Sequence, residues 1–232
     1  MRSTIGRGVA AASLWRHPGL GWLVAALAVG GVAWAALQRP HGPAPAVVRF
    51  KVELPPPAQL SKVSPAPVFS PDGRYLAIPA ELRGDKRLYL LDLSTGEPRL
   101  VPGTEDGGSP AFSSDGRWLA FRSGEKLKKV LVSGGTPIDV ANTRTSALGV
   151  AWGAPGIVYN PKYGLGLWRI SAEGGQPDTV TVPEPGELGH WWPQILPDGE
   201  TVVFTAYRNT LESSSVEAVS LRTGRRTRLV TG

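Results

Sequence analysis

The residues of this sequence best suited to hold a ligand are a histidine and two tryptophans in succession, at positions 190–192. We take His190, Trp191 and Trp192 as candidate ligand-binding residues, with Tyr163 as a fourth from an earlier stretch. Aromatic rings with a polar edge offer a large contact area for a peptide or a sugar, and tryptophan and tyrosine are common at binding hot spots. The alternative is that both indole rings fill the hydrophobic interior, as large aromatic side chains often do.

Few residues are available for catalysis or metal binding. His17 and His41 flank an apolar segment, so His190 is the one histidine of the C-terminal region, and the sequence has no cysteine. One histidine without cysteine does not make a zinc site, and no Gly-x-Ser-x-Gly motif is present to carry a serine nucleophile. The Asp-Gly pairs lack the spaced acidic ligands of a calcium loop and are typical of hairpin turns. We therefore expect a protein that is not an enzyme and needs no cofactor or metal.

The excess of positive charge lies at the N-terminus, away from the candidate residues. The formal net charge is +6, but residues 1–46 hold four arginines and no acidic residue. The remaining residues therefore have 21 basic against 19 acidic side chains. A domain that binds nucleic acid concentrates positive charge on its own surface, so we do not expect a nucleic-acid partner.

An apolar segment near the N-terminus predicts a membrane anchor. Gly19–Leu37 is a run of 19 residues without a charge, and as a helix it is about 28 Å long, close to the hydrocarbon core of a bilayer. We assign residues 19–38 to one transmembrane helix, residues 1–18 to a basic cytoplasmic stub and residues 39–46 to a proline-rich linker. A cleaved signal peptide is the alternative. Both interpretations place the rest of the chain outside the cytoplasm, at the inner membrane of a bacterium.

The remainder of the chain, residues 47–232, contains four copies of one repeat. Phe69-Ser-Pro-Asp-Gly-Arg-Tyr-Leu-Ala returns as Phe112-Ser-Ser-Asp-Gly-Arg-Trp-Leu-Ala, and weaker copies begin at Trp152 and Ile195. The glycines of these turns are spaced by 43, 40 and 43 residues, and a second glycine turn follows each of them about twenty residues later. Short runs of β-branched and aromatic residues on both sides of the turns are typical of strands.

Two hairpins in every repeat of this length form the pattern of a β-propeller blade, because one such sheet cannot cover both of its faces by itself. We predict an all-β fold of four four-stranded blades, at about 64–104, 107–143, 147–182 and 190–232. An extra strand is predicted at 47–55, where it would complete the sheet of a final blade.

The first of these strings, followed by Ser94-Thr-Gly, resembles the WD40-like repeats of TolB-type propellers. Its position behind a single membrane helix is similar to that of the extracytoplasmic propellers of bacterial membrane serine/threonine kinases, although the kinase motifs are absent from this chain. The resemblance implies the sensor part of a kinase-type receptor, which binds a protein or a small peptide or sugar ligand. A TolB-like envelope scaffold and the propeller gate of a prolyl-oligopeptidase-like hydrolase without its catalytic domain are the alternatives.

The number of repeats predicts an incomplete ring. TolB-type propellers usually close with six or more blades, whereas four are recognisable here, so we expect an open arc; closure of the four blades by themselves is the alternative. The free sheet edges and faces at the ends of such an arc would favour self-association.

Overall fold

The computed structural model describes residues 51–61, 67–144 and 148–232. The predicted stub at 1–18, helix at 19–38 and linker at 39–46 lie outside these residues. In the part of the chain that is described, no helix is long and apolar enough to cross a membrane. All regular secondary structure in that part is β-strand.

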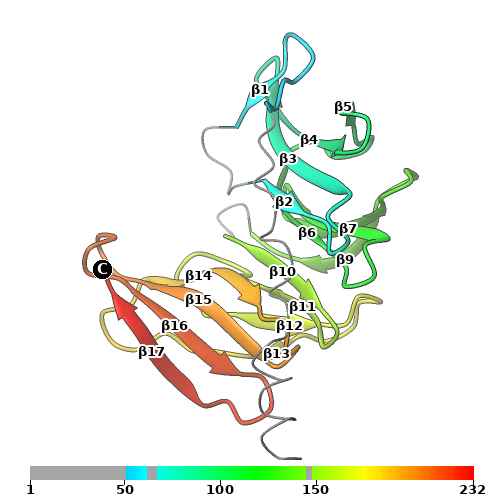
Figure 1. The fold of residues 1–232 in the computed structure, drawn as a ribbon. Coiled ribbons are helices and arrows are strands. Elements are labelled where there is room, and N and C mark those ends of the chain that lie inside the picture. Colours follow the sequence, from blue (N-terminus) through cyan, green and yellow to red (C-terminus); the bar gives the residue numbers. More distant parts are fainter. Residues whose placement is uncertain (1–50, 62–66, 145–147) are drawn as a thin grey trace, which may run out of the picture. The chain divides into compact units, whose positions relative to one another are not determined.

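The strands form four antiparallel sheets, and each sheet is made of one sequence repeat (Figure 1). The first sheet contains β1 (Gln59–Leu60), β2 (Val68–Phe69), β3 (Tyr75–Leu82), β4 (Asp85–Asp92) and β5 (Glu97–Leu100). The second contains β6 (Gly107–Phe112), β7 (Trp118–Ser123), β8 (Lys126–Leu131) and β9 (Ile138–Asn142). The third contains β10 (Val150–Gly153), β11 (Gly156–Tyr159), β12 (Trp168–Ile170) and β13 (Asp178–Thr179). The fourth contains β14 (Gly189–Ile195), β15 (Thr201–Tyr207), β16 (Ser215–Ser220) and β17 (Arg226–Thr231).

Consecutive strands are neighbours in the second, third and fourth sheets, as in a propeller blade. The first sheet differs at its inner edge, where β1 and β2 both pair with β3. Two short strands therefore share the position that β6, β10 and β14 each occupy alone in the other sheets.

The structure corrects the prediction of an extra strand at 47–55. Its described part, residues 51–55, is not in a strand, and Pro55, Pro56 and Pro57 have no N–H to donate to a ladder. Val52, Leu54 and Ala58 pack instead on an apolar cluster of the first sheet. The members of that cluster are Leu76, Ile78, Ala80, Tyr89 and Leu91. The segment thus covers the face of this sheet that points away from the second sheet.

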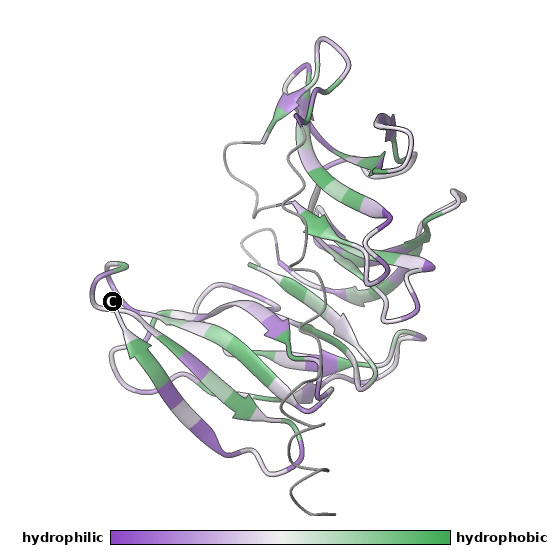
Figure 2. Ribbon diagram, viewed as in Figure 1, coloured by the Kyte–Doolittle hydropathy of each residue, from purple (hydrophilic) through white to green (hydrophobic). Residues whose placement is uncertain are grey.

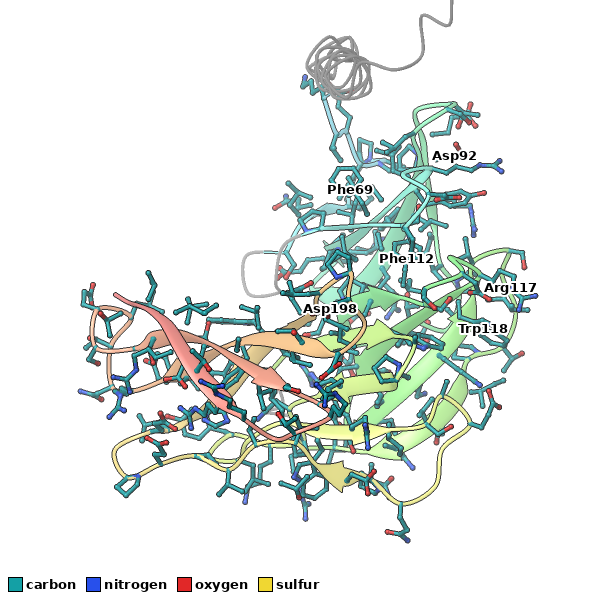
Figure 3. The ribbon with its side chains drawn as sticks, turned by 60° about the horizontal axis from the view of Figure 1, so that its bottom comes forward. Phe69, Asp92, Phe112, Arg117, Trp118 and Asp198 are labelled. Atoms are coloured by element: carbon teal, nitrogen blue, oxygen red, sulfur yellow. The ribbon has the colours of Figure 1, made fainter. Side chains whose placement is uncertain are left out.

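An aspartate holds the first hairpin turn of the second sheet. Asp115 accepts hydrogen bonds from the Ser113 hydroxyl (2.6 Å) and the Arg117 backbone N–H (3.0 Å), and Gly116 has a φ of 69°. The hydrogen bond from Ser113, followed by those from Arg117, lowers the pKa of Asp115 to about 2. Asp198 accepts backbone hydrogen bonds in the corresponding turn of the fourth sheet. Arg117 and Asp198 mark these two turns in Figure 3.

Adjacent sheets pack face to face through three apolar clusters. Large buried side chains at these interfaces include Phe112 and Phe121 between the first and second sheets, Leu127 and Tyr159 between the second and third, and Leu167 and Phe204 between the third and fourth. Figure 2 shows hydrophobic residues along the strands of all four sheets. Since successive residues of a strand point to opposite faces, inner sheets need apolar residues on both.

A β-bulge recurs in the inner strands of the second and fourth sheets. The pairing of β6 with β7 shifts between Gly108 and Ala111, and that of β14 with β15 shifts between Trp191 and Gln194. Ser109 and Trp192 occupy the bulges, each with a φ of 51° and each followed by proline, which cannot donate to the ladder. Gly149 is at the same place in the third repeat and has a φ of 88°.

Gly149 allows a close approach between β10 and β14. A Cβ atom at this position would lie 2.7 Å from both the Trp192 Cα and the Pro193 Cδ atoms. We expect Gly149→Ala to lower the unfolding free energy by about 1–3 kcal/mol, because the backbone of the next sheet would have to move. Thermal unfolding followed by circular dichroism measures this as a lower Tm.

Gly199→Ala is the matched control for that substitution. Gly199 also has a positive φ, of 69°, but no atom lies within 4 Å of its added Cβ. The Gly199→Ala variant therefore reports only the cost of placing an alanine at a positive φ. Equal losses of Tm for both variants would show that the approach of the two sheets at Gly149 is not close in solution.

Candidate functional site

Four aromatic rings gather at the start of the fourth sheet, and we call them the aromatic cluster: Tyr163, Trp191, Trp192 and Tyr207. Trp191 lies at the centre. Its ring is stacked on Tyr207 with centroids 3.8 Å apart, meets Trp192 edge-on at 5.6 Å, and lies 5.5 Å from Tyr163. Each such pair stabilises by about 0.5–1.5 kcal/mol beyond the area it buries. The four rings are therefore joined into one cluster through Trp191.

The cluster has a buried base and an exposed rim. Trp191 is only 6% exposed, whereas Trp192 is 38% and Tyr163 44% exposed. The Trp191 Nε1 atom is buried and has no hydrogen-bond partner among the described residues. It lies beside Gly189, where an added Cβ would be 2.9 Å away. Trp191 is thus the supporting ring, and Trp192 and Tyr163 are the rings that a ligand can reach.

The exposed ring of Trp192 lies at a bulge with a positive φ. A left-handed backbone conformation costs a bulky residue roughly 1–3 kcal/mol, and such strain often accumulates at functional sites. Ser109 and Gly149 take the same position in two other repeats, so the blade itself does not need a large side chain there. The Trp192 ring is therefore held in a strained position that the fold does not require.

The structure separates His190 from the two tryptophans that follow it. His190 pairs with Ala206, and Trp191 pairs with Thr205, so their side chains lie on opposite faces of the sheet. The His190 ring is fully buried, 4.7 Å from the ring of Phe204. It therefore does not contribute to the exposed aromatic surface.

Two hydrogen bonds fix the protonation of His190. The Thr181 hydroxyl oxygen accepts the Leu167 backbone N–H (2.8 Å), so its own hydrogen is free to donate to Nδ1 of His190, 2.6 Å away. The opposite ring atom, Nε2, then carries the proton and donates to the Glu187 carboxylate at 2.9 Å. The ring is neutral and is anchored at both nitrogens.

Glu187 connects this histidine to a buried ionic network, which runs from the loop before β14 to β17. Its side chain is fully buried and accepts hydrogen bonds from Arg226 and, at 3.5 Å, from Arg208. Arg226 also donates to Glu217 on β16. No local sequence pattern marks these residues, because Arg226 and Glu187 are 39 positions apart.

The network shifts the pKa values of its members. Burial is the largest influence on Glu187 and opposes its ionisation, but hydrogen bonds from Arg226, the Glu184 backbone N–H and His190 outweigh it and lower its pKa to about 2. Burial also dominates for His190, where it lowers the pKa despite the hydrogen bond to Glu187. Glu187 is therefore ionised and His190 neutral at physiological pH.

Two loops and the end of a strand, which the sequence places far apart, meet around the aromatic cluster. The Gly164 N–H donates to the Leu188 carbonyl at 3.1 Å, and the Leu188 N–H donates to the Tyr207 carbonyl at 2.7 Å. The loop that carries Tyr163 is therefore joined to the loop before β14, and this in turn to the end of β15. These backbone hydrogen bonds support the loop that carries Tyr163 and the start of β14, which carries Trp192.

No family model matches the chain. An uncharacterized protein of Agrobacterium fabrum is 25% identical over 143 residues, which are 60% of this chain and 34% of that protein. A solved structure assigned to TolB from Agrobacterium tumefaciens has a TM-score of 0.60 and 22% identity, over 70% of this chain and 63% of that one. TolB from Acinetobacter baumannii has a TM-score of 0.60 and 18% identity, over 75% of this chain and 44% of that one.

An oligogalacturonate lyase is similar at a TM-score of 0.52 and 17% identity, over 71% of this chain and 52% of that one. These similarities confirm the predicted likeness to the TolB-type β-propeller fold. The chain spans about a third of the length of the curated relative, and less than two thirds of each of these solved chains.

Acid is expected to lower the stability of the fold by protonating His190 and Glu187. The pKa of His190 is below its ordinary value of 6.5, so stability begins to fall as the pH drops below 6.5. The pKa of Glu187 is about 2 instead of 4.5, so its contribution is complete above pH 4.5 and is lost between pH 4.5 and 2. Tm measured by circular dichroism from pH 8 to pH 2 should fall across both ranges.

Glu187→Gln should reduce the loss below pH 4.5 by the share of Glu187, while Asp115, whose pKa is also about 2, continues to contribute. The substitution should also destabilise the protein by about 3–5 kcal/mol at pH 7, because Arg226 keeps its charge in a partly buried place with one carboxylate fewer. Glu125→Gln is the control, since Glu125 is 58% exposed and its partner Arg144 is 67% exposed. If both variants followed the wild-type Tm profile, the network would have no role in stability.

Proposed function

We propose that this chain is a non-enzymatic propeller module that binds a protein partner through the aromatic cluster. The observation that carries this proposal is Trp192, which is 38% exposed at a bulge with a φ of 51°. Exposed tryptophan and tyrosine on a rigid support are the residue types that contribute most to protein–protein binding. The partner we favour is an extended peptide segment of another protein, because the flat rings can pack along it.

The receptor role is the wider form of this proposal. We propose that the N-terminal apolar segment holds the module on the outer side of a bacterial inner membrane, as the sensor part of a kinase-type receptor. The Arg-flanked run Gly19–Leu37 supports the anchor. A TolB-like envelope scaffold is the second candidate, and the similarity in fold to solved TolB structures favours it.

Self-association through the fourth sheet is a further part of the proposal. Val216 and Val230 pair across β16 and β17 on the face opposite to the buried Glu217, and they are 36% and 59% exposed. Apolar residues exposed together on a sheet face favour contact with another surface. The open arc expected from the number of repeats stays a prediction.

Trp192→Gly tests the aromatic cluster as a binding site. Glycine removes the ring and tolerates a positive φ, so we expect an unchanged or higher Tm. Peptides selected against the wild-type protein from a random phage-displayed library should bind the variant at least about tenfold more weakly, as for a hot-spot tryptophan. Fluorescence anisotropy with labelled peptides measures the Kd.

Leu131→Ala is the matched control for Trp192→Gly, because Leu131 is also 38% exposed but lies on the second sheet. It should leave peptide affinity unchanged. A large fall of Tm in Trp192→Gly would assign the ring to the hydrophobic core. Unchanged affinity for every selected peptide would place the binding surface elsewhere.

Reporter fusions test the membrane topology. Alkaline phosphatase fused after Gly232 should be active, because this enzyme folds outside the cytoplasm, and the fusion should remain in the membrane fraction at full length. Leu27→Arg should abolish both results, because a charge at the centre of the span opposes insertion. A soluble, shortened product would indicate a cleaved signal peptide, and an inactive fusion would reject export.

A further inference from the structure

A groove between the second and third sheets contains polar groups that the fold leaves unused. It consists of two adjoining hollows of about 400 and 460 Å³, which share Lys126, Asn142 and Trp168 as lining residues. We call it the inter-sheet groove. Its residues come from β8, β9, β11 and β12 and from the loops beside them, so it is lined by a different set of side chains from the aromatic cluster.

The first unused group is the hydroxyl of Thr143. In the first and third sheets, threonines at the corresponding place accept a backbone hydrogen bond: Thr104 from Leu88 (3.1 Å) and Thr181 from Leu167 (2.8 Å). In the second sheet the ladder of β8 and β9 continues to Lys126↔Asn142. Thr143 is 8% exposed and lines the groove. Its hydroxyl is buried and has no hydrogen-bond partner among the described residues.

The second unused group is the hydroxyl of Tyr159. The same position is taken by Ile78, Phe121 and Phe204 in the other three repeats, which have no polar atom to satisfy. Tyr159 is 1% exposed, lines the groove, and its hydroxyl has no partner in the described part of the chain. Burial raises its pKa to about 12, so the hydroxyl keeps its proton and is able to donate.

Buried hydroxyls without partners are rare, because each forfeits the hydrogen bonds that it makes in water. Here two of them occur in one groove, and both occur where a repeat departs from its sister repeats. A ligand with hydroxyl groups of its own would satisfy them, since a hydroxyl both donates and accepts. The indole of Trp168, at the junction of the two hollows, offers an apolar surface for the C–H face of a sugar ring.

The charges around the groove favour an acid. Lys126 pairs with Asp139 at 3.3 Å, and Arg144 approaches Glu125 at 3.9 Å. Lys162 also lines the groove and has no ion pair with any described residue. Three cations therefore face two carboxylates, which leaves one positive charge to be neutralised. A ligand carboxylate next to Lys162 would form a charge-assisted hydrogen bond.

We propose that the inter-sheet groove binds a sugar acid, with its carboxylate at Lys162 and its hydroxyls at Thr143 and Tyr159. This site is additional to the proposed function, because no residue of the aromatic cluster contributes to it. The ligand is either a free sugar acid or an acidic unit within a saccharide chain. Both sources present the same carboxylate and ring hydroxyls to the groove.

Ligand-observed NMR titration of the full chain tests the proposal, with glucuronate as the probe. Methyl β-D-glucuronide represents the unit inside a saccharide chain, and glucose and propionate lack the carboxylate and the hydroxyls respectively. We expect glucuronate or its methyl glycoside to bind at least about tenfold more tightly than glucose and propionate. Tighter binding of glucuronate would indicate a free sugar acid as the ligand, and tighter binding of the methyl glycoside would indicate a unit within a saccharide chain. Absence of binding by both uronates would overturn the proposal.

Three substitutions connect the binding to the named residues. Lys162→Gln should weaken glucuronate binding about tenfold by removing the charge. Tyr159→Phe and Thr143→Val should each weaken it by about threefold or more, with Tm unchanged or higher, because each removes an unpartnered hydroxyl. Equal binding by all three variants and the wild type would also overturn the proposal.

Two controls separate this site from the fold and from the aromatic cluster. Thr104→Val makes the same chemical change as Thr143→Val but removes a satisfied hydroxyl, so it should lower Tm and leave glucuronate binding unchanged. Trp192→Gly should also leave glucuronate binding unchanged. If Trp192→Gly abolished it while Lys162→Gln did not, the sugar acid would bind at the aromatic cluster and the groove would be rejected.

Discussion

The structure depends on covering both faces of small sheets. A repeat of about forty residues makes a sheet that is apolar on two sides, and burial against neighbours is the main source of its stability. Phe121, Leu127 and Phe204 lie at successive interfaces of this kind. Where no other sheet covers the first one, Val52, Leu54 and Ala58 do so instead. Tight contact between adjacent sheets also explains why a glycine is needed at Gly149, where a side chain would strike the next sheet.

Within this apolar stack, polar groups mark the places where the repeats differ. Most buried polar atoms of the described residues have partners, and the Glu187–Arg226 pair shows how completely a buried charge is compensated. Thr143 and Tyr159 are exceptions. Since four copies of one module provide an internal comparison, a departure in one copy can be recognised without any other sequence. These departures place the candidate sites on particular sheets, although all four sheets have the same architecture.

The repeat pattern was sufficient to predict the four sheets, because hairpin turns and strand composition are local properties of the sequence. It could not predict register. The bulge at Trp192 and the alternation along β14 decide that His190 and Trp191 are buried on opposite faces of the sheet while Trp192 is exposed. The sequence did group Tyr163 with the tryptophans, and the structure brings their rings together. Tyr207 and Glu187 were missed because their roles depend on contacts between loops. The expected extra strand was wrong in its described part, residues 51–55, which leads into three prolines that cannot donate to a ladder.

The recurring bulge has a consequence for how such a protein can diversify. Serine, glycine and tryptophan occupy one backbone position in three successive modules, and the proline that follows two of them helps to keep the local geometry the same. At Trp192 this position displays an exposed ring, whereas Gly149 has no room for a side chain, because a Cβ there would lie 2.7 Å from the backbone of the next sheet. Recognition can therefore change at single blades, and only at those where the neighbouring sheet leaves space for the new side chain.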